Sequence, residues 1–153
     1  MGVKCSPATV AEEPATGTDM VGMKVWWLVT EATAGSVNVA ANLCEVPPGA
    51  GHALHRHPGA EEVLIVLDGD GTRLGADPEQ TFPVTAGDMV LTPAGEWHGF
   101  ANTGDRTARI SVVYGGVATR AAAGYDEHPD GRARLQALLD HADTTTSPAR
   151  PWT

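Results

Sequence analysis

The sequence predicts an all-β domain, and three of its features lead to that prediction. From about Met23 onward, short runs rich in valine, leucine, threonine and aromatic residues alternate with turn sequences. This alternation is typical of a sandwich or barrel and differs from the longer repeat of alternating strands and helices. The turns carry glycine, proline, asparagine and aspartate, as in Pro47-Pro48-Gly49. Val63–Leu67 is apolar at every position, so we expect one of its faces to line the barrel and the other to meet a second layer or another subunit.

Nine segments have the composition and length of strands, and each is bounded by turn residues. The expected strands are Lys24–Thr30, Val37–Val46, His52–His57, Glu62–Asp68, Gly71–Leu74, Gln80–Val84, Met89–Thr92, His98–Asn102 and Arg106–Tyr114.

The 153 residues fit one domain by the usual prior of roughly 100–200 residues per domain. Residues 1–22 show no periodic pattern and predict a flexible N-terminal arm, whereas residues 23–116 predict the barrel. Residues 117–141 form a C-terminal extension. Within it, leucines at i, i+3 and i+4 spacing predict a short amphipathic helix over Asp130–His141. We expect residues 142–153, which are rich in threonine, serine and proline, to form a disordered tail.

Charge and cysteine content narrow the possible partners and the compartment. The formal net charge is −9, from 10 basic and 19 acidic residues, which argues against nucleic acid or an anionic membrane as a partner. No apolar run approaches the roughly 20 residues that span a bilayer. Met1–Val10 lacks the hydrophobic stretch of a signal peptide. The two cysteines, Cys5 and Cys44, form no disulfide framework, so we expect a cytoplasmic protein.

Three histidines and a glutamate have the spacing of a metal site. His55 and His57 are two residues apart on one expected strand, so their side chains share a face. Glu62 opens the next strand, and His98 comes from a third strand beyond a Pro-Ala-Gly turn. Imidazole and carboxylate donors suit a divalent transition metal better than calcium or magnesium, which prefer oxygen ligands. If these groups were buried without a metal, they would need many hydrogen-bond partners.

At this point the sequence resembles the cupins, because both sequence motifs of that family are complete and in order. The first motif is glycine, His-x-His, glutamate and glycine, here Gly49, His55, His57, Glu62 and Gly69. The second motif is glycine, Pro-x-Gly, histidine and asparagine, here Gly87, Pro93, Gly95, His98 and Asn102. The resemblance therefore implies that all four metal-ligand positions of the family are filled.

The resemblance implies a double-stranded β-helix, or jelly-roll barrel, with an added N-terminal arm and a C-terminal helix. It also implies one divalent metal, which can be Fe, Mn, Ni, Cu, Co or Zn. Small cupins with this ligand set look most like metal-dependent dioxygenases that act on aromatic or polyketide-like substrates. Two alternatives remain: a non-redox cyclase or isomerase, in which Glu62 or Glu61 carries protons beside the metal, and a non-catalytic cupin that binds a small ligand.

Strand parity assigns further side chains to the pocket or to the outside. Glu61 points away from Glu62 on a regular strand, although a bend after Pro58 would make Glu61 the ligand instead. His52 lies on the opposite parity to His55 and outside the ligand set. Arg56 and Trp97 point outward. Asn102 either caps the turn at Asn102-Thr103-Gly104-Asp105 or donates a hydrogen bond to a metal ligand. Asn38, Asn42 and Cys44 share a face that lines a cavity or meets solvent. The expected pocket is apolar and suits a planar substrate; its lining residues are Leu64, Val66, Met89, Leu91 and Phe100.

We also expect a homodimer. Cupin strands at the edge of a sheet often pair between subunits. Val63–Leu67 and Trp26-Trp27 supply apolar surface that a second subunit can bury.

Overall fold

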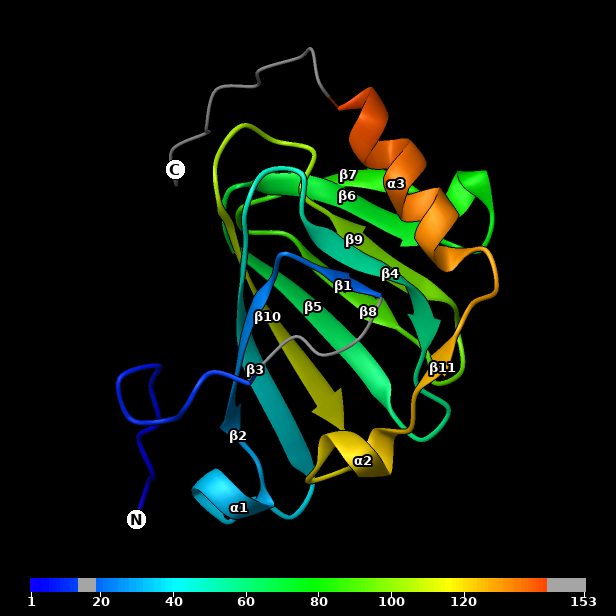
Figure 1. Ribbon diagram of the computed structural model, residues 1–153. Coiled ribbons are helices and arrows are strands. Elements are labelled where there is room, and N and C mark those ends of the chain that lie inside the picture. Colours follow the sequence, from blue (N-terminus) through cyan, green and yellow to red (C-terminus); the bar gives the residue numbers. More distant parts are fainter. Residues whose placement is uncertain (14–18, 143–153) are drawn as a thin grey trace.

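The computed structural model describes residues 1–13 and 19–142. Two antiparallel sheets face each other and form the jelly-roll barrel that the sequence predicts (Figure 1). Their inner side chains meet in one apolar core, which includes Val46, Leu64, Val66 and Ile110. The disordered tail expected for residues 142–153 lies, apart from Ala142, outside the described residues.

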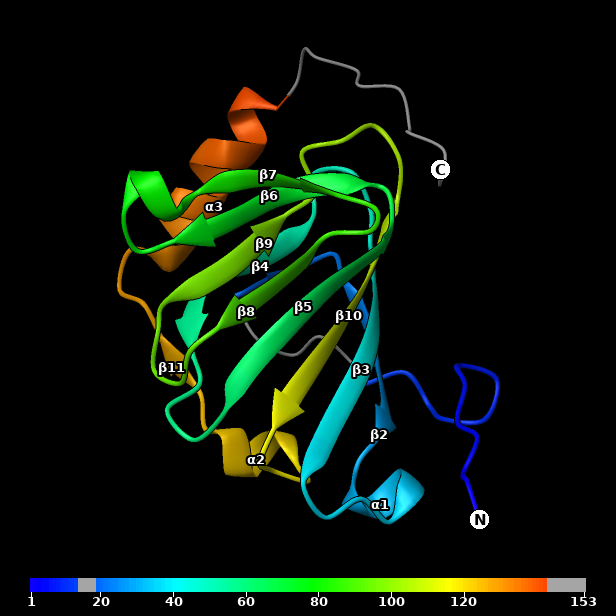
Figure 2. The same ribbon diagram turned by 180° about the vertical axis from the view of Figure 1, so that it is seen from behind.

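The five-stranded sheet has the order β2-β3-β10-β5-β8. Its strands are β2 (Lys24–Val29), β3 (Val39–Val46), β5 (Glu61–Asp68), β8 (Met89–Thr92) and β10 (Ala108–Gly115). In β5, residues 62, 64 and 66 are buried in the barrel, whereas Val63 and Ile65 are half-buried and Leu67 is 40% exposed. No helix lies over this outer face (Figure 2). The second layer expected there is therefore absent from the part of the chain that the structure describes.

The six-stranded sheet has the order β1-β4-β9-β6-β7, and β11 also pairs with β4. Its strands are β1 (Met20–Val21), β4 (Gly51–Arg56), β6 (Asp70–Gly75), β7 (Phe82–Thr85), β9 (His98–Ala101) and β11 (Asp126–Glu127). The expected strands are confirmed with shifts of one or two residues at their ends, but β1 and β11 were not predicted. Within the expected N-terminal arm, Met20–Val21 forms strand β1, because these two residues pair with His52 and Gly51.

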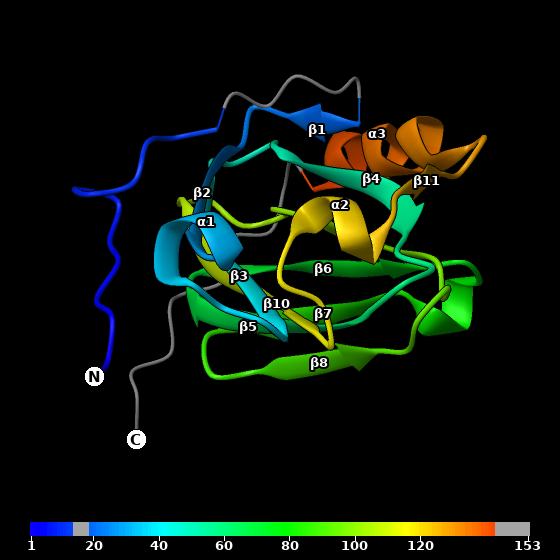
Figure 3. The same cartoon turned by 90° about the horizontal axis from the view of Figure 1, so that it is seen from below.

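Three short helices and a 3₁₀ turn complete the described chain. They are α1 (Glu31–Ala34), η1 (Pro78–Gln80), α2 (Arg120–Ala123) and α3 (Gly131–His141). The expected C-terminal helix is confirmed as α3, which packs against β4 and β9. Its Leu135 is 1% exposed, and it joins Leu54 and Leu74 in a second apolar cluster on the outside of the six-stranded sheet. In the view from below, α2 lies at the end of the barrel, between the two sheets (Figure 3).

Candidate metal centre and cavity

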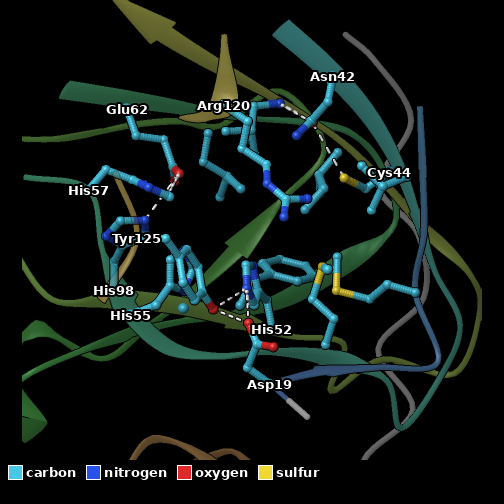
Figure 4. Close-up of a pocket in the computed structure, with 18 of the residues that line it drawn as sticks. Asp19, Asn42, Cys44, His52, His55, His57, Glu62, His98, Arg120 and Tyr125 are labelled. Atoms are coloured by element: carbon cyan, nitrogen blue, oxygen red, sulfur yellow. Dashed lines mark hydrogen bonds and ion pairs between the residues drawn. The ribbon is translucent and has the colours of Figure 1, made fainter. Parts of the chain in front are cut away.

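The four-donor cluster consists of the side chains predicted from sequence spacing: His55, His57, Glu62 and His98. β4 supplies His55, the turn after β4 supplies His57, β5 supplies Glu62, and β9 supplies His98. All four side chains are buried, and one donor atom from each lies within 4.8 Å of the others. The sequence therefore predicted which residues converge, and Figure 4 shows them along one side of a cavity.

A backbone carbonyl holds one ring nitrogen of each histidine. Nδ1 of His55 donates to Ala53 O at 2.8 Å, Nδ1 of His98 donates to Glu96 O at 2.9 Å, and Nδ1 of His57 donates to the O atom of Gly124 at 2.7 Å. With the proton on Nδ1, a neutral ring presents its Nε2 lone pair. Such backbone partners are typical of histidines that bind a metal.

The electrostatics of the cluster favour a bound cation. Burial raises the pKa of Glu62, but the neighbouring rings of His98 and His57 hold that pKa well below its usual range. Burial, with His52 and His98 nearby, lowers the pKa of His55 well below its usual range. An ionised carboxylate and neutral imidazoles are the forms that bind metals.

Oxygen and nitrogen lone pairs face each other inside the cluster. Oε2 of Glu62 lies 3.0 Å from Nε2 of His98 and 3.5 Å from Nε2 of His57. A ring that donates through Nδ1 to a backbone carbonyl directs its Nε2 lone pair at this oxygen, so a cation held between these atoms would satisfy all of them. The imidazole and carboxylate donors fit a divalent transition metal in this place.

The cavity beside the cluster has a volume of about 250 Å³. Its inner wall is mainly apolar and aromatic, and its lining includes Met23, Trp27, Leu64, Phe100 and Val112. Leu64 and Phe100 therefore lie where the sequence predicted them. Val66 is fully buried in the core and is not part of the lining.

The prediction that Met89 and Leu91 line the pocket is wrong. They are 69% and 60% exposed, because β8 pairs with β5 in the register Met89–Ile65 and Leu91–Val63. Directly opposed residues on paired strands share a face, so Met89 and Leu91 lie on the outer face of the sheet. The sequence predicted strand β8, but it did not predict the pairing with β5 that determines which face of β8 lies inside the barrel.

The structure distinguishes the two positions expected for the polar side chains near β3, lining a cavity or facing solvent. Asn42 and Cys44 are buried and line the cavity, whereas Asn38 precedes the strand and is exposed. Cys44 donates to Oδ1 of Asn42 at 3.4 Å. Burial and nearby Glu62 raise the pKa of Cys44 to about 12, so this thiol stays protonated at neutral pH.

His52 lines the cavity, contrary to the parity prediction, although it remains outside the four-donor cluster. β4 pairs with β9 at His52–Phe100 and again at His55–His98. Three steps on β4 thus match two steps on β9, which is a β-bulge. The extra residue turns His52 to the same side as His55, and the two rings stack with centroids 3.8 Å apart.

Asp19, His52 and Tyr125 form a hydrogen-bonded group that we call the Asp19 network. Oδ2 of Asp19 accepts hydrogen bonds from the Tyr125 hydroxyl and from Nε2 of His52, the latter at 2.9 Å. The Tyr125 ring stacks on His55 at 5.0 Å between centroids. The hydrogen bond from His52 lowers the pKa of Asp19, and burial lowers the pKa of His52. Strand patterns did not predict this group, because Asp19 and Tyr125 lie in the segments before and after the barrel.

Two arginines border the cavity. Arg120 of α2 pairs with Glu13 at 2.5 Å. Arg73 is 5% exposed and donates to the backbone oxygens of Leu74 and Gly99 and to the Thr92 hydroxyl. Among the described residues no carboxylate lies within 4.0 Å of the Arg73 guanidinium, and burial lowers its pKa.

Three outward or structural predictions agree with the structure. Arg56 lies over the Trp97 ring at 4.6 Å and pairs with Asp126. Asn102 holds its turn, since its side chain donates to the backbone of Val46 and Arg106 and accepts from the Gly104 amide. Glu61 is exposed.

A profile of the cupin domain matches residues 42–114, the segment that contains the four-donor cluster. The chain belongs to the cupin superfamily. Among curated relatives, polyketide synthase CurC of Streptomyces cyaneus is 31% identical over 99 residues, 64% of this chain and 62% of that protein. Protein SchB of Streptomyces halstedii is 33% identical over 98 residues, 64% of this chain and 70% of that protein. The chain spans 55% and 62% of the first curated relatives it matches.

The cupin fold also matches solved structures over nearly its whole length. The polyketide cyclase RemF of Streptomyces resistomycificus superimposes with a TM-score of 0.72 at 21% identity. The match covers 93% of this chain and 98% of RemF, so it includes segments outside the barrel. Within the described residues, no helix of this cupin is long and apolar enough to cross a membrane.

Proposed function

We propose that this cupin is a metal-dependent enzyme that closes a ring in a polyketide-like substrate without consuming oxygen. The single observation that supports this most is the four-donor cluster at the side of a mainly apolar and aromatic cavity of about 250 Å³. The similarity to CurC favours a polyketide-like substrate. A bound divalent ion supplies Lewis acidity at a substrate carbonyl.

The chain's own residues suit enolate chemistry. His52 donates through Nε2 to Asp19, which leaves the lone pair of a neutral His52 on Nδ1. Among the described residues, none hydrogen-bonds to that Nδ1. Burial lowers the pKa of His52, so the ring is neutral at pH 7 and can accept a proton from a carbon next to a carbonyl. We propose His52 as this base and Glu62 as a metal ligand, since the low pKa of Glu62 makes it a weak proton acceptor.

Oxygen chemistry is the competing proposal, because the same donor set suits Fe²⁺ and Mn²⁺ as well as Zn²⁺. The test incubates Zn²⁺-loaded protein with a linear poly-β-ketone under strict anaerobiosis and analyses the products by mass spectrometry. Ring closure followed by dehydration yields a product that has lost water. Turnover only with a redox metal and oxygen, with a product that has gained oxygen atoms, would establish the dioxygenase instead. Ligand-dependent melting shifts with no turnover under any condition would indicate a binding protein.

We also propose that the protein works as a homodimer in the cytoplasm. β8 is an edge strand, and its exposed Met89 and Leu91 continue the half-buried Val63 and Ile65 of β5. Unpaired strand edges with apolar side chains are suited to pairing between chains. A second copy can therefore cover this face. Light scattering should give the mass of a dimer for the wild type and of a monomer for Met89→Glu; a monomeric wild type would contradict the proposal.

A further inference from the structure

Tyr114 is the one phenol in direct hydrogen-bond contact with the four-donor cluster, among the residues that the structure describes. It lies on β10 directly opposite Glu62 of β5. The side chain is 4% exposed, and its ring packs against His57 at 4.5 Å and Trp27 at 5.4 Å between centroids. Its hydroxyl lies 2.9 Å from Nε2 of His57. Because Nδ1 of His57 already donates to Gly124, the hydroxyl is the donor in this contact.

The same nitrogen is the one that His57 offers to a metal. A single lone pair cannot accept a hydrogen bond and bind a metal at the same time, so metal binding releases the Tyr114 hydroxyl. Among the described residues, no other group hydrogen-bonds to it. A buried tyrosine hydroxyl needs a partner, and it must therefore find a new acceptor in the metal-loaded protein.

Two acceptors are available: an oxygen of Glu62, or a ligand that enters from the cavity. Oε2 of Glu62 faces His57 and His98 within the cluster, where it serves as a metal donor. Tyr114 borders the cavity, as do the neighbouring Asn42 and Cys44. The hydroxyl is therefore placed to meet an incoming molecule at the open side of the cluster.

We infer that Tyr114 donates a hydrogen bond to an anionic oxygen or nitrogen atom of the molecule bound at the metal's open position, such as an enolate or phenolate oxygen. This role rests on the metal site of the proposed function but not on ring closure itself. It makes Tyr114 a substrate-contacting residue. A hydrogen-bond donor aimed at developing negative charge stabilises it without any rearrangement of solvent.

The test uses Co²⁺-loaded wild type and Tyr114→Phe, with azide as the probe. Phenylalanine keeps the ring that packs against His57 and Trp27, and circular dichroism checks the fold. Azide binding is followed by the cobalt absorption spectrum, and Co²⁺ affinity by competition with a chelator. We expect unchanged Co²⁺ affinity and azide binding weakened about tenfold, the usual effect of losing one hydrogen bond to an anion. Ser111→Ala is the matched control, because Ser111 lies on the same strand and its hydroxyl donates to the backbone O of Asn42 rather than to the cluster.

The other outcomes overturn the inference. Weaker Co²⁺ binding with unchanged azide affinity would mean that Tyr114 holds Glu62 in place. Unchanged affinities for both Co²⁺ and azide would mean that the Tyr114 hydroxyl has no role at the metal and that only its ring packs there. A phenolate-to-metal charge-transfer band in Cu²⁺-loaded wild type would make Tyr114 a ligand itself, and this measurement needs no variant. Failure of the wild type to bind any metal would instead contradict the proposed function.

Discussion

Replacing Asp19 by asparagine tests whether the segments before and after the barrel are coupled at the cavity. Asp19 is 8% exposed and accepts hydrogen bonds from both His52 and Tyr125. Hydrogen bonds to a charged group contribute about 1.5–3 kcal/mol each to stability. Tyr125 is 38% exposed, so solvent competes for its bond, and the lower end of that range applies. We expect Asp19→Asn to lower the free energy of unfolding by about 2–3 kcal/mol, part of it from each partner.

The coupling between Asp19 and Tyr125 is measured with a double-mutant cycle. Urea unfolding of wild type, Asp19→Asn, Tyr125→Phe and the double variant should give an interaction energy of about 1–2 kcal/mol. Glu127→Gln is the control, because this exposed carboxylate lies two residues from Tyr125 and outside the network. Additivity within about 0.5 kcal/mol would refute the reasoning, since independent sites behave in that way.

The pH dependence of this effect has a defined sign. The hydrogen bond from His52 lowers the pKa of Asp19 below its ordinary 3.8. A depressed carboxyl pKa gives stability that is present above the unfolded-state value and is lost as the pH falls through the folded-state value. The stability difference between wild type and Asp19→Asn should therefore be constant near neutrality and shrink below pH 3.8.

Three further predictions follow from burial and register. Glu62→Gln should bind Zn²⁺ far more weakly than wild type in a chelator competition, while Glu61→Gln should match wild type, because only Glu62 is buried in the cluster; the reverse result would put the ligand on Glu61. Iodoacetamide should label Cys5 and spare Cys44 until the protein unfolds, since burial raises the pKa of Cys44 to about 12; rapid labelling of both would contradict the burial. Gly99→Ala should lower the melting temperature and weaken Zn²⁺ binding, because a Cβ atom there would meet His52 O at 2.7 Å; an unchanged variant would show that β9 moves freely away from β4.

The sequence predicted the four-donor cluster because its members have fixed spacing on regular strands or next to tight turns. Parity placed Glu61 and Glu62 on opposite faces of β5, and the spacing of the first cupin motif, with six residues between Glu62 and Gly69, selected Glu62 as the ligand. The same rule failed for Met89 and Leu91, because parity says which residues share a face but not which face is inside. Which face of β8 lies inside depends on its pairing with β5, and this pairing cannot be predicted from the sequence of either strand alone.

His52 shows a different limit. A single extra residue between His52 and His55 reverses the alternation of side chains between the two faces of β4. Residues 52 to 55 themselves carry no sequence signal that predicts this bulge. The partner strand did carry a signal, because glycine inside a strand often marks a bulge or a close backbone approach. Gly99 is such a glycine, since its Cβ position lies 3.1 Å from the backbone of Ala53.

The free edge of β4 explains why Asp19 and Tyr125 meet at all. β1 pairs with Gly51 and His52 on this edge, and β11 pairs with His55 and Arg56. Between them, the Ala53 amide donates to Asp19 O at 2.8 Å, and Leu54 O accepts from the His128 amide at 3.0 Å. The segments before and after the barrel thus lie end to end along the edge of β4 and hydrogen-bond to its backbone. Covering a strand edge in this way prevents it from pairing with another chain.

This arrangement has a consequence for the cavity. β4 carries His55, and His57 is the residue directly after its end, so the edge that both chain segments cover belongs to the strand of the metal centre. Covering that edge brings Asp19 and Tyr125 beside His52, and it brings Gly124 O to Nδ1 of His57. The barrel motifs determine which side chains converge on a metal, whereas the flanking segments determine the polar groups around it. Substrate choice in this cupin should therefore respond more to changes at Asp19 and Tyr125 than to changes on the outer strands.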